Sequence, residues 1–272
     1  MNWYRIWAMI RKDVIEFTKS KYVMSAVIGM PLLFAILFPI SSVLPIAKLD
    51  SAEFETAEFG QFIDNLFSKA IENWDSLNPQ AQTLVMIAYS MFIVVLLLPI
   101  IIPAVTASET VVGEKERKTM EAVLASPMSE SEIVMGKILS SFLPSVIGTL
   151  VAAIGYIIIT DIIVYPHIGQ LLFPDLISMI LVFVFSPMVS IISVELMIMI
   201  STRVTSVRDA YQLGSLIVLP LIMLVVAEMF GLLFQSTITM IAGIAILAVL
   251  IFILFKLTTN IFDRERALVK MV

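Results

Sequence analysis

The stretch "LVMIAYSMFIVVLLLPIIIPAVTA", residues 84–107, contains no charged side chain. A helix needs about 20 mostly apolar residues to cross the hydrocarbon core of a bilayer, so this stretch predicts a membrane-spanning helix. It is followed closely by "GEKERKTMEAVLASP", residues 113–127, which carries six charges in its first nine residues. A second apolar run comes next, so the order predicts two spanning helices joined by a short charged connection.

The composition extends this prediction to the whole chain. Of its 272 residues 60% are hydrophobic and 14% are charged, and the mean hydropathy is +1.02, values outside the range of soluble domains. Backbone polar groups in hydrocarbon must be hydrogen-bonded within the protein, which favours helices. We therefore expect an all-α membrane protein with six transmembrane helices, at residues 22–47, 84–107, 138–160, 176–201, 213–234 and 238–257.

Several function classes are excluded by what the chain lacks. It has no cysteine and one histidine, which leaves no disulfide framework, no thiolate metal site and no H-E-x-x-H motif. The one Gly-Lys pair, Gly136 and Lys137, has no P-loop glycine at the required spacing. We assign no catalytic residue, no metal and no cofactor bound by this chain, and we expect no nucleic-acid partner.

Basic residues predict the orientation. Fifteen of the 17 lysines and arginines fall in the N-terminal segment, the second and fourth connections and the C-terminal tail. Positive charge is retained on the inner side of a membrane, so both termini and the charged stretch should be cytoplasmic. The first external loop, residues 48–83, has only two lysines and seven acidic residues, and it contains an amphipathic helical pattern.

Residues 114–127, which we call the charged connector, should lie beyond the membrane. Asn78 and Pro79 predict the start of the preceding helix, Gly113 predicts its end, and Ser129 with Glu132 form a capping box for the next. The connector has balanced charge and an apolar stripe of Met120, Val123 and Leu124. These features fit docking in a groove of another protein, and they also fit a solvated linking helix without a partner.

The N-terminal segment predicts a helix lying in the membrane interface. One face is apolar, with Trp3, Ile6, Trp7, Ile10, Val14 and Phe17, and another carries Arg5, Lys12 and Lys19. Trp3 and Trp7 would anchor this helix among lipid headgroups, with Arg5 and Lys12 beside them.

Two acidic residues fall inside predicted spans, Glu195 and Glu228. An ionised carboxylate at mid-membrane is costly, so Glu195 should face the bundle or a wet cavity, or be protonated. A place on the translocation path and a structural hydrogen bond both explain it. In the third span, small residues around Gly148 and Gly155 favour close helix packing, either within the chain or at a dimer seam.

A family resemblance enters with the run "SETVVGEKERKTMEAVLASPMSESEIVMGK", residues 108–137. It resembles the signature of type-2 ATP-binding-cassette (ABC) permeases, and more narrowly the branch with sodium-efflux and drug-export permeases. The segments "RVTSVRDAYQLGSLIVLPL", residues 203–221, and "FDRERALVK", residues 262–270, are similar as well. The resemblance covers the six-span layout.

The resemblance implies a coupling helix that docks on a separate ATPase subunit. The residues that match the family pattern are Glu116, Arg117, Thr119, Glu121, Leu124 and Pro127. ATP and Mg would be bound by the ATPase, and two permease copies, expected to be a homodimer in the cell membrane, would complete an exporter. Residues 1–21 would be the elbow helix and residues 22–272 the permease domain.

One other class of transporter is kept as an alternative. An ion-coupled secondary carrier or channel could use Glu195, with Glu228 as a second candidate, to bind its driving cation. A membrane-embedded hydrolase is disfavoured because the chain offers no Ser/His/Asp or metal constellation.

Overall fold

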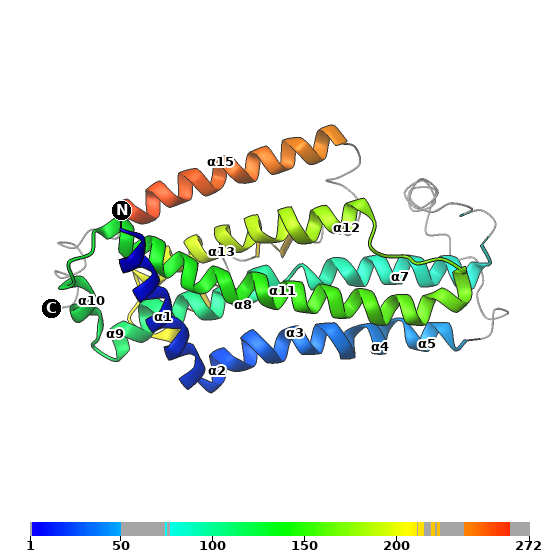
Figure 1. Ribbon diagram of the computed structural model, residues 1–272, viewed down its shortest axis with the longest axis horizontal. Helices are drawn as coiled ribbons and strands as arrows, with labels where there is room; N and C mark the ends of the chain where they lie inside the picture. Colours follow the sequence, from blue (N-terminus) through cyan, green and yellow to red (C-terminus); the bar gives the residue numbers. More distant parts are fainter. Residues whose placement is uncertain are drawn as a thin grey trace.

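The computed structural model describes residues 2–49, 74, 77–210, 212–214, 219–220, 222–223 and 237–261. Within these ranges the regular elements are all helical, and they form one elongated bundle (Figure 1). Five described helices are long and apolar enough to cross a membrane: Lys21–Ala47, Pro79–Glu116, Glu130–Ile168, Leu176–Ser201 and Ile238–Thr259. The predicted all-α membrane fold is confirmed. Most of the expected span at residues 213–234 and most of residues 48–83 lie outside the described residues, so the sixth span stays a prediction.

The first span is a chain of short helices joined by wider turns. It consists of α2 (Lys21–Met24), α3 (Met30–Leu32), α4 (Phe38–Ser42) and α5 (Leu44–Ala47), with π-helical turns at Ser25–Gly29 and Leu33–Leu37. Pro31, Pro39 and Pro45 each stand in the first turn of a short helix. Proline cannot donate the backbone hydrogen bond that a continuous α-helix needs there, and a π-helical turn accommodates the interruption.

The second span begins where the sequence indicates and ends later than expected. α7 (Pro79–Val95) starts after Asn78, whose side-chain oxygen accepts a hydrogen bond from the Ala81 amide at 2.7 Å. α8 (Leu98–Ser108) continues it through a π-helical turn, Glu109–Gly113, into α9 (Glu114–Glu116). The expected end at Gly113 is therefore wrong, because Gly113 is itself helical with φ −59°.

The helix does not end at Gly113, as its residue type suggests, and the chain turns at Lys118 instead. A Cβ atom on Gly113 would lie 3.0 Å from the Glu109 carboxyl carbon and 3.1 Å from an Arg117 guanidinium nitrogen. A larger residue there would push these two charged side chains aside, so glycine leaves them room. The chain turns instead at Lys118, whose φ of 56° is in the left-handed region.

The third span, α11 (Glu130–Ile168), is 39 residues long. At about 1.5 Å per residue it is roughly 58 Å long, well beyond the ~30 Å hydrocarbon core. The predicted capping box at its start is confirmed, since the Glu132 amide donates to Ser129 Oγ and the Ser129 amide to Glu132 Oε2. α11 is therefore longer than the hydrocarbon is thick, and it reaches both ends of the bundle (Figure 1).

Small residues on α11 let other segments of the chain approach closely. A Cβ atom on Gly136 would lie 2.8 Å from Met9 Cγ, one on Gly148 would lie 2.8 Å from Ile102 Cδ1, and one on Gly155 would lie 2.6 Å from Ala35 Cβ. The partners belong to α1 (Trp3–Lys19), to α8 and to the first span. Of the two alternatives for this face, packing within the chain is the one that the structure shows.

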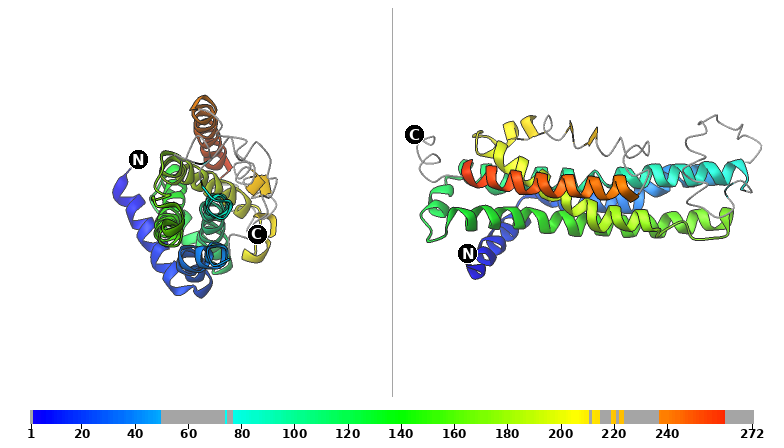
Figure 2. Two further views of the ribbon diagram at one scale, coloured as in Figure 1. Left: turned by 90° about the vertical axis from the view of Figure 1, so that its right-hand side faces the viewer. Right: turned by 90° about the horizontal axis from the view of Figure 1, so that it is seen from above.

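The core of the bundle lies between α8, α11 and the fourth span. That span comprises α12 (Leu176–Ile180), a π-helical turn at Leu181–Phe185, and α13 (Ser186–Ser201). α8, α11 and α13 pack on one another, and α15 (Thr237–Ile261) lies along α13 (Figures 1 and 2). α1 crosses α11 at the end of the bundle that carries the charged connector (Figure 1). We call this the connector end.

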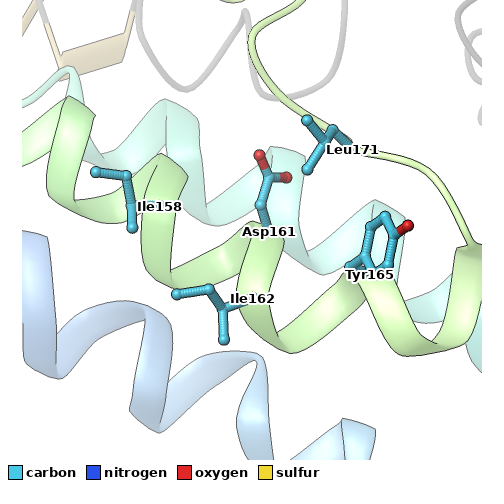
Figure 3. A pocket seen from close by; sticks show the side chains of 5 residues that line it. All are labelled: Ile158, Asp161, Ile162, Tyr165 and Leu171. Atoms are coloured by element: carbon cyan, nitrogen blue, oxygen red, sulfur yellow. The ribbon is translucent and has the colours of Figure 1, made fainter.

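The polar side chains at the opposite end make bonds within the fold. Asp161 Oδ1 accepts from the Leu172 and Phe173 amides at 3.0 and 3.2 Å, and the Asp175 side chain caps α12. His167 Nε2 lies 3.1 Å from the Ala47 carbonyl oxygen. Asp161 also lines a pocket together with Ile158, Ile162, Tyr165 and Leu171 (Figure 3). These contacts secure the connection between α11 and α12.

The glycine contacts yield a test of the packing. We expect Gly155→Ala to lower the free energy of unfolding by about 1–3 kcal/mol, since its new methyl group would overlap Ala35. Gly29→Ala is the matched control, because nothing lies within 4 Å of the position that its Cβ would take. Thermal unfolding of both purified variants in one detergent measures the difference. Equal stabilities would contradict the contact between α11 and the first span.

Candidate functional site

The charged connector has a buried side and an exposed side. It holds α9 and α10 (Met120–Leu124), which lie across the connector end of the bundle (Figure 1). Met120, Val123 and Leu124 are buried in a core cluster that also contains residues of α11 and α13. The apolar stripe therefore packs on the chain's own bundle and is not free for a groove in another protein. Packing against the ends of the spans removes these apolar side chains from water, and this favours their inward orientation.

A buried ion cluster fixes the start of the connector. Glu114 is fully buried, and its Oε2 accepts from the equally buried Lys137 Nζ of α11 at 2.7 Å. Its Oε1 accepts from Lys12 Nζ of α1. Lys137 also donates to the Thr110 carbonyl oxygen. One carboxylate thus joins α1, the connector and α11 at a single point.

Asp13 adds a second acid to this cluster from α1. It is buried, and its Oδ2 accepts from Ser140 Oγ of α11 at 2.9 Å, while its Oδ1 lies 3.3 Å from Lys12 Nζ. Burial raises the pKa of Asp13 above its ordinary value, although the charges of Lys137 and Lys12 act in the opposite direction.

Lys12 is held in its charged form by the same cluster. Burial lowers the pKa of Lys12, but the negative charges of Glu114, Asp13 and Glu16 outweigh that effect, and the pKa lies above its ordinary value. Lys12 of α1 therefore stays protonated and contributes a positive charge to the bonds around Glu114.

A more exposed layer of ion pairs covers the cluster. Arg117 Nη1 lies 2.7 Å from Glu109 Oε1, and its Nη2 lies 3.1 Å from Glu16 Oε2 of α1. Burial lowers the pKa of Arg117, but its bond to Glu109 and the neighbouring carboxylates outweigh that effect, so the pKa lies above its ordinary value. Glu109, Arg117 and Glu16 thus make a second link between the second span and α1.

The connector is also bonded to the end of α13. Lys115 Nζ donates to the carbonyl oxygens of Ser201, Thr202 and Val204 at 2.7, 2.9 and 3.1 Å. The last carbonyls of a helix lack partners within it and carry partial negative charge. The lysine donates hydrogen bonds to these carbonyls and places a positive charge beside them. Glu116 Oε1 accepts from the Val207 amide at 2.8 Å, just beyond this helix end.

The start of α1 is attached to the far end of the connector. Arg5 Nη1 donates to the Pro127 carbonyl oxygen at 2.6 Å and lies 3.7 Å from Glu132 Oε2. The Asn2 amide donates to the other oxygen of Glu132. Two of the four residues assigned to membrane anchoring, Arg5 and Lys12, thus bond to protein groups, while Trp3 and Trp7 are exposed. Ile6, Ile10 and Phe17 of this helix are buried, and Phe17 packs in a cluster with Val23 and Ala26 of the first span and Val105 of α8.

The structure separates the six residues assigned to coupling. Glu116, Arg117, Thr119, Glu121 and Pro127 are exposed, while Leu124 is buried in the core cluster. Lys118, Ala122 and Ala125 are exposed beside them. We call Lys118, Thr119, Glu121, Ala122, Ala125 and Pro127 the outer face of the connector. The side chains of this face are polar or small.

Residues that sequence reasoning missed form the inner attachment. They are Asp13, Glu16, Glu109, Glu114, Lys115 and Lys137. One signal was available: Lys137 stands inside a helix that is otherwise apolar on both sides, so it needed a buried partner. Nothing in the sequence indicated that the partner is Glu114.

Glu195 lies in α13 and is 1% exposed. Its Oε2 has no hydrogen-bond partner, and no lysine or arginine forms an ion pair with it in the described part of the chain. The expectation that it faces the bundle agrees with this burial. Glu228 lies outside the described residues.

Comparison with known families gives one match. A family model described as "ABC-2 family transporter protein" matches residues 7–240, well over half of the chain. The matched region begins within α1 and includes the whole connector. A search of curated proteins gave no match.

The ion cluster yields a stability test. Lys137→Met removes the buried partner of Glu114, and we expect a loss of about 3 kcal/mol in the free energy of unfolding, because a buried charge loses its main counter-charge. Glu114→Gln added to Lys137→Met should recover most of the loss by removing that charge. Arg117→Ala is the control and should cost under about 1 kcal/mol, as its pairs are partly exposed. Equilibrium unfolding in mixed micelles measures all three, and a double variant no more stable than Lys137→Met would refute the pairing.

Proposed function

Because the chain belongs to the ABC-2 transporter family, we propose that it is the permease subunit of an ATP-driven exporter, moved by a separate ATPase subunit. The chain is a multi-pass membrane protein of a transport family. The branch that includes sodium-efflux and drug-export permeases is the one we favour, from the motif in residues 108–137. ATP and Mg would be bound by the partner, and this chain would perform no chemistry.

The observation that carries the proposal is the two-sided connector. Its inner side is bonded to three separate helices, through Lys12 to α1, through Lys137 to α11 and through Lys115 to α13. Its outer face is exposed. A displacement of the outer face would therefore be passed to three helices at once, since the inner bonds hold them to the connector. This is the arrangement that a coupling element requires.

The six coupling residues then take different roles. Thr119, Glu121 and Pro127 lie on the outer face and would contact the ATPase directly. Glu116 and Arg117 are exposed but also bonded to Val207 and to Glu16 and Glu109, so they would pass motion from the outer face inward. Leu124 would hold α10 against the core.

We further propose that the connector end is cytoplasmic, with both termini on that side, as the distribution of basic residues favours. Trp3 and Trp7 would contact lipid at the inner interface, since they are exposed on α1. The complex would contain a second copy of the permease.

A carrier driven by an ion gradient is the second candidate, and the buried Glu195 is the observation that favours it. The two differ in energy source. Transport that is abolished by vanadate and by removal of ATP supports the exporter, while transport that follows an imposed ion gradient without ATP supports the carrier.

The outer face yields a test of partner binding. Glu121 is exposed and forms no ion pair with any described residue, so Glu121→Arg should leave the fold intact. We expect it to reduce ATPase recovered by affinity capture from native membranes about tenfold, the effect of losing one well-placed interfacial contact. Lys115→Met is the matched inner variant, and it should still capture the ATPase but lose vanadate-sensitive transport.

Two results would contradict this assignment. One is capture of the ATPase by Glu121→Arg at the wild-type level together with unchanged transport. The other is full transport by Lys115→Met, which would show that the bonds to α13 do not carry the motion.

A further inference from the structure

A pocket at the surface of the bundle is formed by α11 and by the connection that follows it. Ile158, Asp161, Ile162 and Tyr165 belong to α11, and Leu171 belongs to the connection to α12 (Figure 3). The cavity volume is about 480 Å³. Sites for small ligands usually have roughly 300–1,000 Å³. The four lining residues other than Asp161 are more than half exposed, so the pocket is open to the surroundings of the bundle.

Asp161 gives this pocket its charge. The residue is 9% exposed, and its Oδ1 accepts from the Leu172 and Phe173 amides at 3.0 and 3.2 Å. Its Oδ2 has no hydrogen bond to a described residue, and no described lysine or arginine forms an ion pair with the carboxylate. Figure 3 shows the carboxylate directed toward Leu171. One oxygen is thus used by the fold, and the other is available to a ligand.

The exposed face of α11 that leads to the pocket is apolar throughout. Its members are spaced three or four residues apart, which places them on one side of the helix. They are Leu143, Ile147, Val151, Ile154, Ile158 and Ile162. At 1.5 Å per residue the face is about 29 Å long, and the hydrocarbon core of a bilayer is ~30 Å thick. This match indicates that lipid acyl chains cover the face.

Asp161 lies at the end of this apolar face. It directly precedes Ile162, the last apolar residue of the face, and the exposed Tyr165 follows one turn later. Tyrosine is enriched where hydrocarbon meets lipid headgroups. α11 continues only to Ile168, about 10 Å beyond Asp161. The carboxylate is therefore at the depth of the headgroups, and a positively charged headgroup would supply its missing counter-charge.

The carboxylate favours one kind of headgroup over others. Its oxygen accepts hydrogen bonds, and a primary ammonium group, as in an ethanolamine headgroup, donates them and carries a positive charge. A choline headgroup has the same charge, but its nitrogen carries no hydrogen atom to donate. A glycerol headgroup leaves the lipid with the negative charge of its phosphate, which the carboxylate repels.

We propose that the pocket binds a phospholipid with a primary-amine headgroup. The ammonium group pairs with Asp161 Oδ2, and the acyl chains lie on the apolar face of α11. The same carboxylate holds the Leu172 and Phe173 amides, so the lipid stabilises the connection between α11 and α12. This lipid is a bound component of the protein and not its cargo. The inference therefore goes beyond the proposed transport function and does not depend on it.

The test is mass spectrometry of the intact full-length protein released from detergent, which counts the lipid molecules retained. Dioleoyl phosphatidylethanolamine, phosphatidylcholine and phosphatidylglycerol are added to delipidated protein at equal concentration. We expect wild type to retain the ethanolamine lipid at least about fivefold more than the choline lipid, the effect of one partly exposed ion pair. Asp161→Asn should abolish this preference. Asparagine keeps an oxygen that can accept from the Leu172 and Phe173 amides, so the connection is preserved.

Two matched comparisons accompany this variant. Asp175→Asn removes a negative charge from the same connection, outside the pocket, and should keep the preference, since asparagine also caps helices. Ile162→Ser shortens the pocket wall and should reduce retention of the ethanolamine lipid several-fold, whereas Ile147→Ser, on the same face but outside the pocket, should not. Ile147 and Ile162 are both more than half exposed, so this pair decides the question even where Asp161→Asn does not fold.

Three results would overturn the site. The first is equal retention of the three lipids by wild type. The second is a preference that Asp161→Asn keeps or that Asp175→Asn also loses, because the pocket carboxylate would then not be its cause. The third is a lipid-free dimer that Ile162→Ser dissociates, which would assign the apolar face to a second copy of the chain.

Discussion

The bonds around Glu114 are the constraint on which the connector end depends. Glu114 and Lys137 are both fully buried, so each has lost its hydration, and the cost is recovered only because the pair is close and further hydrogen bonds satisfy the remaining atoms. Lys12 donates a hydrogen bond to the second carboxylate oxygen of Glu114, and the Thr110 carbonyl oxygen accepts one from Lys137. Because such a pair is expensive to break, it specifies one relative position of α1, the connector and α11.

This constraint explains why a stretch rich in charge is not simply a solvated loop. Glu114 and Lys115 point their charges at the chain itself, one to lysines and the other to the end of α13. α10 turns Met120, Val123 and Leu124 into the core. What remains for a partner is a face of small and polar side chains on a rigid base. Such a face can recognise another protein by shape and charge without exposing an apolar patch to water.

The two polar regions of the bundle differ in how far they are satisfied. At the connector end, the buried charges bond to opposite charges, hydroxyls or carbonyls. In α11 and α13, the hydroxyl oxygens of Ser141, Ser145 and Ser190 and Glu195 Oε2 lack partners. Paired buried charges favour one arrangement of the helices, whereas buried polar atoms without partners cost free energy.

The sequence by itself determined the class of protein and the places where helices begin. Apolar runs, the cap at Asn78 and the capping box of Ser129 and Glu132 depend on residues within a few positions of one another, and the structure shows both caps and five of the six predicted spans. Only the tertiary structure decided that Gly113 continues a helix, that Leu124 faces inward, and which lysines hold Glu114. Lys12 and Glu114 are 102 residues apart. Their contact arises from the packing of α1 across α11, and no local pattern of residues encodes that.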